Sequence, residues 1–355
     1  MSTPSASKLY VGPAGPAVYS TWADEYVVAD QYTAATGAAG LVDRSHVGRL
    51  KVTGADALDL LDRLSTNRLD DLAIGHGLYT VLTSSKGRIV DLLFVSRQDG
   101  HLLVLTGPDT RSRVAEWIDF YTFTEDVTVE DVPDAVSMLA VVGPSAAEVV
   151  DEASGERLSR LAPCESAKAA IGEAEVLAIR TDFARIPGYD LVVAASEQMS
   201  LRDELLRRGE SLGLKPVGTE ALEMVRIEQG VPVQGNELNE DANPLEAGLL
   251  DHISFNKGCY IGQEVVARLD TYDKVQRKLV GVSWNENAAP VERAPLRFDE
   301  TEVGYTTSHA RSPRLDRPVA LAYVRNAHAK PGTALSMDST DGRVEVRVEG
   351  LPLTP

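Results

Sequence analysis

The sequence predicts an α+β fold in which ferredoxin-like units form the body of the protein and a β-barrel follows at the C-terminus. Three observations support this prediction. Short strands that end in glycine and lead into helices recur in the first half of the chain, and a hairpin signal lies among them. After about residue 272, helical patterns nearly vanish and short strands separated by turn residues take over.

The recurring unit is a strand, a glycine turn and a helix. Residues 50–54, 102–108 and 140–144 each carry an apolar strand closed by glycine. Proline follows the glycine in the second and third units, which suits the first turn of a helix. Between the first two units, residues 78–82 and 89–95 flank a glycine-containing turn and predict a β-hairpin.

Later segments complete the body and the barrel. Residues 175–180 and 189–194 read as a strand pair, residues 199–212 as a helix, and residues 219–229 have helical periodicity. The expected barrel strands lie at residues 275–284, 301–308, 319–324, 333–337 and 343–349.

The chain is therefore expected to comprise three parts. Residues 1–20, rich in Ser, Pro, Gly and Ala, form a flexible arm. Residues 21–272 form the α+β body, with two subdomains that meet near residue 135, and residues 273–355 form the barrel.

The composition and net charge of the chain exclude several classes of function. The 355 residues, 43% hydrophobic and 25% charged, are typical of a soluble globular protein with two or three domains. A net charge of −18 argues against direct binding to nucleic acids or anionic membranes, since both require a basic surface. We find no apolar run of the roughly 20 residues that span a bilayer, and no signal peptide. Two cysteines with no CxxC or HExxH motif fit a reducing cytoplasm and predict no metal site.

The most informative motif is an eight-residue stretch, namely Lys257, Gly258, Cys259, Tyr260, Ile261, Gly262, Gln263 and Glu264. A helix is expected to begin near Gly262. A thiol just before a helix start and beside an ammonium is expected to have a lowered pKa and a reactive thiolate. The alternative for Cys259 is a buried structural cysteine at a tight turn, the commoner outcome for this residue type. The other cysteine, Cys164, lies in a polar stretch, and we interpret it as incidental.

Three stretches together resemble the YgfZ family of folate-binding proteins, relatives of the aminomethyltransferase (T-protein) of the glycine cleavage system. Residues 257–264 resemble the family's KGCY-x-GQE signature. Residues 226–247 are similar to the segment that precedes this signature, and residues 303–322 to the T-protein C-terminal barrel. The resemblance implies a body built around a central channel that holds tetrahydrofolate or a one-carbon derivative. It also implies iron–sulfur proteins or cluster-assembly factors as partners, including enzymes that modify tRNA.

Asp91, early in the second strand of the hairpin, is the candidate catalytic carboxylate. In the T-protein pattern a carboxylate at the matching position lies near the reactive folate nitrogens and orients the one-carbon unit. A carboxylate can accept hydrogen bonds from N–H groups or act as a base. The alternative is a solvated aspartate at a strand start. The T-protein pattern usually has two adjacent acids here, whereas Leu92 follows Asp91.

Three further residues are candidate folate contacts. Arg226 and Glu228 lie two residues apart, so they would share a face only in an extended segment. Arg226 would clamp the glutamate-tail carboxylates, Glu228 would pair with the pterin amino group, and Glu246 is a candidate for the same task. The alternative for Arg226 is a structural ion pair with an unidentified carboxylate. A second acidic pair of the T-protein pattern is replaced here by Ile186 and Pro187.

Together, the motif around Cys259 and the candidate folate contacts predict a tetrahydrofolate-binding accessory protein for iron–sulfur cluster assembly or repair. This protein would act through a reactive Cys259. One cysteine cannot hold a cluster alone, so any cluster contact would be shared with a partner. The alternative is a folate-dependent aminomethyltransferase or demethylase that uses Asp91, with Cys259 structural. A folate-binding scaffold without thiol chemistry is a third possibility.

Overall fold

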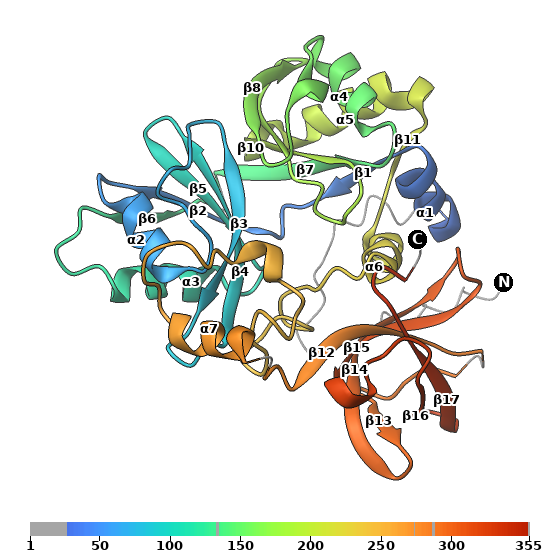
Figure 1. Ribbon diagram of the computed structural model, residues 1–355. Helices are drawn as coiled ribbons and strands as arrows, with labels where there is room; N and C mark the ends of the chain where they lie inside the picture. The colour runs from blue at the N-terminus through green and yellow to red at the C-terminus, as the bar shows by residue number, and fades with distance from the viewer. Residues whose placement is uncertain (1–26, 133–134, 273, 286–287, 354–355) are drawn as a thin grey trace.

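A computed structural model describes residues 27–132, 135–272, 274–285 and 288–353. The arm expected over residues 1–20 lies outside the described residues. The described chain forms two sheets and a closed barrel (Figure 1).

The first sheet is antiparallel, with strand order β3-β4-β5-β2-β6. Its strands are β2 (Gly48–Thr53), β3 (Gly77–Thr83), β4 (Ile89–Gln98), β5 (His101–Thr106) and β6 (Thr128–Asp131). Helices α2 (Ala57–Leu64) and α3 (Arg111–Phe120) bury their apolar residues against one face of this sheet. The expected hairpin is the β3–β4 pair, so the local glycine signals identified these elements correctly.

The second sheet has six strands in the order β11-β1-β7-β10-β9-β8. They are β1 (Ala39–Asp43), β7 (Val136–Val142), β8 (Ser166–Ile171), β9 (Ala174–Arg180), β10 (Gly188–Ala194) and β11 (Leu214–Pro216). Helices α4 (Ala146–Ser154) and α5 (Gln198–Gly209) pack on one face, and α1 (Val28–Gly37) and α6 (Thr219–Glu228) on the other. Strand β1 precedes the first sheet in sequence but pairs with β7 and β11, so the chain passes between the two sheets more than once.

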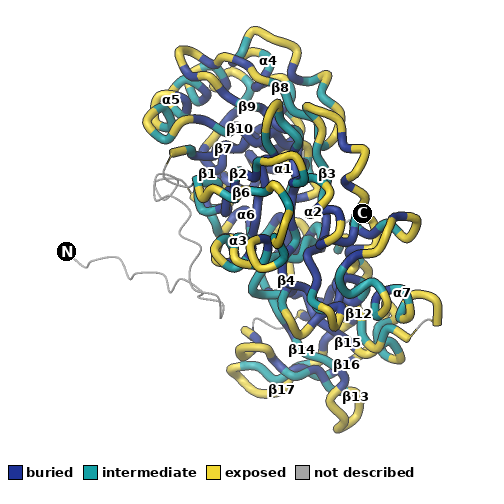
Figure 2. Tube along the Cα trace, turned by 90° about the vertical axis from the view of Figure 1, so that its left-hand side faces the viewer, coloured by how far each residue is buried: buried dark blue, intermediate teal, exposed yellow. Residues whose placement is uncertain are grey.

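The two sheets face each other through a shared apolar cluster. Phe94, Leu103 and Leu105 of the first sheet pack with Met138 and Ile179 of the second. In Figure 2 the strands are buried along much of their length, whereas the outer surfaces of α4 and α5 are partly exposed. Short 3₁₀ helices complete this part of the chain: η2 (Leu158–Arg160), η3 (Ala195–Glu197), η4 (Glu210–Leu212) and η5 (Leu250–His252).

The C-terminal part is a closed barrel with strand order β12-β15-β14-β13-β16-β17, as the sequence predicts. Its elements are β12 (Arg277–Ser283), β13 (Pro295–Phe298), β14 (Thr301–Ser312), β15 (Arg317–Arg325), η6 (Asn326–His328), β16 (Ala334–Ser339) and β17 (Gly342–Glu349). Of these strands, β13 has no counterpart in the sequence prediction, because a four-residue strand carries little periodic signal. The fold class, α+β with a C-terminal barrel, is confirmed.

Residues 229–249 lie between the first sheet and the barrel. Leu238 and Ala247 from this loop pack with Val81 and Ile89 of the first sheet and with Tyr323 of the barrel. The loop therefore joins the two parts through apolar contacts that each part would otherwise leave exposed.

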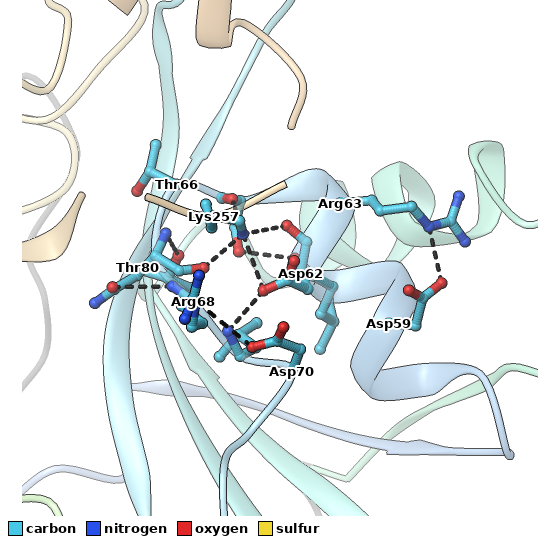
Figure 3. Close-up of polar contacts among 12 residues, drawn as sticks. Asp59, Asp62, Arg63, Thr66, Arg68, Asp70, Thr80 and Lys257 are labelled. Atoms are coloured by element: carbon cyan, nitrogen blue, oxygen red, sulfur yellow. Dashed lines mark hydrogen bonds and ion pairs between the residues drawn. The ribbon is translucent and has the colours of Figure 1, made fainter. Parts of the chain in front are cut away.

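The motif around Cys259 is anchored to the end of helix α2 and the residues after it by the buried side chain of Lys257 (Figure 3). Its ammonium donates to the carbonyl oxygens of Asp62 (2.5 Å), Ser65 (3.0 Å) and Asn67 (2.6 Å) and lies 3.0 Å from the Asp62 carboxylate. These carbonyls lie at and just after the C-terminal end of α2, where helix carbonyls lack intrahelical partners and the dipole favours a cation. Burial lowers the pKa of Lys257, and the nearby Asp62 opposes that effect.

The helix after this motif, α7 (Gln263–Thr271), begins at a glycine that the packing requires. Gly262 has φ of +85°, and a Cβ atom there would lie 2.5 Å from the carbonyl oxygen of Ser84 in the β3–β4 turn. Gly258, in the same motif, has nothing within 4 Å of a Cβ position. Only one of these two glycines is therefore needed for the packing of α7 on the hairpin.

Replacing Lys257 by methionine is expected to lower the free energy of unfolding by about 3–5 kcal/mol, because it leaves Asp62 and three carbonyls without their cation. Urea denaturation measures this loss. The exposed Lys168 on strand β8 provides the control, since Lys168→Met is expected to change stability by no more than about 0.5 kcal/mol. Equal effects of the two substitutions would contradict the anchoring role.

The variant Gly262→Ala is expected to lose about 1–3 kcal/mol of stability, because the left-handed backbone and the Ser84 carbonyl both oppose a side chain. Gly258→Ala is the matched control and is expected to be neutral. Thermal unfolding of both variants tests this, and a neutral Gly262→Ala would show that α7 begins without this constraint.

Candidate functional site

Asp91 lies near the start of β4 and is only 1% exposed, so the alternative of a solvated aspartate is wrong. Its Oδ2 atom accepts hydrogen bonds from the backbone N–H of Gly107 (3.0 Å) and the hydroxyl of Thr110 (2.5 Å). Its Oδ1 atom accepts from the N–H of Leu92 (2.8 Å). A carboxylate offers about four acceptor positions, so these three bonds leave capacity for one more donor.

The protonation of Asp91 reflects two opposing influences. Burial raises its pKa to about 6, while the hydrogen bonds from Thr110, Gly107 and Leu92, and the positive charge of Arg113, favour the ionised form. At pH 7 the carboxylate is mostly ionised, yet its pKa is close enough to neutrality for proton exchange. This combination is typical of a general base.

Gln234 lies beside Asp91, and sequence reasoning did not identify it. Its side-chain nitrogen donates to the carbonyl of Val90 (3.2 Å), and its Cβ and Cγ atoms lie over Gly107, where an added Cβ would come within 2.8 Å of both. Its Oε1 atom is buried and has no hydrogen-bond partner among the residues the structure describes. A buried acceptor without a partner invites a donor, so Asp91 and Gln234 together present acceptor atoms suited to a ligand rich in N–H groups.

Arg226 lies in helix α6, so the extended geometry in which it would share a face with Glu228 is wrong. It pairs with Glu223 (2.5 Å) and Glu237 (3.5 Å) and donates to the hydroxyl of Ser308 on strand β14 (2.8 Å). The sequence left open a structural ion pair between Arg226 and an unidentified carboxylate. Glu223 and Glu237 provide that carboxylate. The side chain, 4% exposed, links α6 to the barrel.

Glu228 has a similar linking position. Its carboxylate accepts hydrogen bonds from the hydroxyl of Tyr32 in α1 (2.7 Å) and from the hydroxyl of Ser312 in β14. Burial, reinforced by Glu228, raises the pKa of Tyr32 far above its ordinary value. The carboxylate therefore joins α1, α6 and the barrel.

Glu246 lies in the loop of residues 229–249, near the turn that leads into β4. Its carboxylate is 3.3 Å from Arg277 and 3.7 Å from Arg88, which precedes β4. The described residues thus divide the four candidates into two groups: Asp91 and Glu246 beside strand β4, and Arg226 and Glu228 on α6.

Cys259 is exposed and carries a free thiol, so the alternative of a buried structural cysteine is wrong. The ammonium of Lys257, expected to support a thiolate, instead uses its three donors on carbonyls of residues 62–67. Its distance of 5.6 Å from the ring centre of Tyr260 fits a cation–π contact. Cys164 is half-buried in the cluster between the two sheets, and burial raises the pKa of its thiol.

In the part of the chain that the structure describes, no group of three or more His, Cys, Asp or Glu side chains is placed to hold a metal ion. Every helix within the described ranges is too short or too polar to cross a lipid bilayer.

Comparison with known proteins identifies the family. The GCVT N-terminal domain model matches residues 10–257, and the glycine cleavage T-protein C-terminal barrel domain model matches residues 277–354. The chain is 30% identical to an aminomethyltransferase of Bacillus pumilus over 92% of its own length and 90% of that protein's. It is 33% identical to an aminomethyltransferase of Symbiobacterium thermophilum over 92% and 88% of the two lengths.

A solved structure supports the fold. The glycine cleavage system aminomethyltransferase T from Bartonella henselae superposes with a TM-score of 0.82 at 24% identity, covering 92% of this chain and 89% of that one. With one family model matching most of the body and a second matching the barrel, the chain belongs to the glycine cleavage T-protein family.

Proposed function

We propose that this protein is a tetrahydrofolate-dependent aminomethyltransferase, or a closely related one-carbon transferase, with Asp91 as its catalytic carboxylate. The observation that carries the proposal is the buried Asp91, whose pKa is raised to about 6, together with Gln234 at the neighbouring Val90, whose Oε1 atom has no hydrogen-bond partner among the described residues. Relatives named aminomethyltransferase match nearly the whole chain, which supports the same activity.

The chemistry follows from the acceptor atoms at the site. Tetrahydrofolate presents amine N–H groups, and Asp91 has one acceptor position left to receive such a donor. As the reacting nitrogen bonds to the one-carbon unit it must lose a proton, and an ionised carboxylate with a pKa near 6 can take it. The donor carries the unit as an aminomethyl group, R–CH2–NH2. Two folate nitrogens bond to its carbon while the bonds from that carbon to the amine and to R break, and the two N–H protons leave with ammonia and R–H, so the product is methylenetetrahydrofolate.

The folate is proposed to lie along β4, with Gln234 beside Val90 and Glu246 beside Arg88. Gln234 would orient the ligand by accepting a hydrogen bond, and Glu246 would face its amino groups. Arg226 and Glu228 are buried and already have protein partners, so we assign them to holding α6 against the barrel. This assignment replaces the direct folate contacts expected from the sequence.

A second candidate function rests on one observation, the exposed thiol of Cys259 in a motif that resembles the YgfZ signature. In this reading the folate-bound protein supports iron–sulfur proteins, including tRNA-modifying enzymes, through contact between the thiol and a cluster, a persulfide or a partner's thiol. The absence of a second acid after Asp91 and the pair Ile186–Pro187 favour it over the aminomethyltransferase. The buried Asp91 and the named relatives favour the aminomethyltransferase.

Two variants separate these functions. Asp91→Asn is expected to reduce formation of methylenetetrahydrofolate by at least about 100-fold, the contribution of a typical general base, whereas Cys259→Ala is expected to retain full activity. The measurement is turnover with an aminomethyl donor and tetrahydrofolate. Loss of activity in Cys259→Ala, or normal activity in Asp91→Asn, would contradict the assignment of Asp91 as the catalytic carboxylate. A defect of iron–sulfur enzymes in cells that carry only Cys259→Ala would favour the second function.

The pH dependence of the same reaction tests the state of Asp91. The carboxylate must be ionised to accept a proton, so activity is expected to fall as the pH drops through about 6. The Thr110 hydroxyl donates to the ionised form and lowers this pKa, so Thr110→Val is expected to move the acid limb to higher pH. An unchanged limb in Thr110→Val would show that another group controls the profile.

A further inference from the structure

Strand β6 forms one edge of the first sheet, and in the part of the chain that the structure describes it pairs with β2 alone. The N–H of Val132 donates to the carbonyl of Arg49 (3.4 Å) across this pair. Because donors alternate along an antiparallel ladder, the N–H and C=O groups of Val129 and Asp131 then point away from β2. Such an edge, with backbone groups directed outward, can accept a further strand.

A groove lies between this strand and helix α3. Its volume is about 410 Å³, and Ala115, Val127 and Val129 provide its apolar surface. Glu116 also lines the groove, and Phe120, one helical turn later on the same face of α3, is 68% exposed. A strand added beside β6 would therefore find room for its side chains between the edge and the helix.

Two carboxylates in the groove, those of Glu116 and Asp119, form no ion pair and no side-chain hydrogen bond with the residues that the structure describes. The acids of β6 itself are held by basic residues, in the ion pairs Lys51–Glu130 (3.2 Å) and Arg111–Asp131 (2.9 Å). Two β6 strands side by side would bring their acids together, and like charges on neighbouring strands destabilise the pairing. Charge complementarity therefore favours a basic occupant over a second copy of this chain.

We propose that the open edge of β6 and the groove beside α3 form a docking site for an extended basic segment of a partner protein, which joins the first sheet as an added strand. The backbone of the segment exchanges hydrogen bonds with the outward N–H and C=O groups of Val129 and Asp131. On the groove side the segment presents lysine or arginine. The aliphatic part of that side chain packs on Val129, and its charged end pairs with Glu116 and Asp119.

This docking site is separate from Asp91. Strands β5 and β2 lie between β4 and β6, which corresponds to about 14 Å across the sheet. Helix α3 connects the two places, because it begins after Thr110, whose hydroxyl donates to Asp91, and ends at Phe120 beside the groove. A partner held at β6 is thus brought to the sheet that carries Asp91 without occupying the site around it, and docking at this edge does not depend on the proposed function.

Calorimetric titration of the full-length protein at low ionic strength tests the docking site with three peptides. The first alternates lysine with threonine, the second alternates glutamate with threonine, and the third is the lysine peptide N-methylated at every residue, so that it donates no backbone hydrogen bonds. The proteins are wild type, the double variant Glu116→Gln/Asp119→Asn, and the control Glu148→Gln/Glu152→Gln. The control removes the same charge from two exposed residues of α4.

Wild type and the α4 control are expected to bind the lysine peptide with equal affinity. The Glu116→Gln/Asp119→Asn variant is expected to bind it about tenfold more weakly, because it loses two partly exposed ion pairs. The glutamate peptide and the N-methylated peptide are expected not to bind. In wild type, the lysine peptide is expected to slow amide hydrogen exchange in residues 127–132, which locates it on β6 without relying on any variant.

Four results would overturn the proposal: no binding of the lysine peptide by wild type, equal affinity of wild type and Glu116→Gln/Asp119→Asn, equal binding of the N-methylated peptide, or slowed exchange confined to other segments. Slowed exchange in residues 127–132 that rises with protein concentration and needs no peptide would assign the edge to a second copy of the chain instead.

Discussion

The proposed chemistry depends on one constraint, the burial of a single carboxylate on strand β4. A buried carboxylate is costly unless hydrogen bonds satisfy it, and Asp91 receives three from Gly107, Thr110 and Leu92. Two of these donors belong to the turn between β5 and α3, so the strand–glycine–helix unit builds the site directly. Burial outweighs the hydrogen bonds and raises the pKa to about 6, which leaves the group mostly ionised at pH 7.

A second set of buried polar contacts fixes the parts that surround this carboxylate. Glu228 joins α1 and α6 to strand β14, and Arg226 joins α6 to the same strand through Ser308. Glu237 accepts from Ser308 (2.6 Å) and from the N–H of Val233 (3.0 Å), at the start of the loop that carries Gln234. These charged residues are conspicuous in the sequence, yet their energetic role is to hold the barrel, α6 and the loop in one arrangement.

Local signals allowed much of the fold to be predicted. Glycine turns and apolar runs identified the β3–β4 hairpin, the three strand–glycine–helix units and the barrel, because each depends on neighbours in sequence. The pairing of β1 with β7 and β11 escaped prediction, since it joins segments roughly a hundred or more residues apart. A short strand does not specify its distant partners.

The site was predicted less completely, for physical reasons that differ by residue. Asp91 was identified by resemblance, but its burial depends on the turn at Gly107 and on the loop that carries Gln234. Gln234 lies 144 residues after Val90, to which it donates a hydrogen bond. Lys257 was expected to act on its sequence neighbour Cys259, whereas the fold directs it to carbonyls some 190 residues earlier. Gln234 belongs to no catalytic motif, and only the three-dimensional structure reveals its unpaired oxygen.

The most direct test of the central claim is a crystal structure of the complex with tetrahydrofolate. The account predicts that a nitrogen atom which receives the one-carbon unit lies within hydrogen-bond distance, about 2.6–3.2 Å, of the Asp91 carboxylate. It also predicts that the Oε1 atom of Gln234 accepts a hydrogen bond from the ligand. A folate bound elsewhere, with Asp91 sealed behind Gly107 and Thr110, would contradict the account.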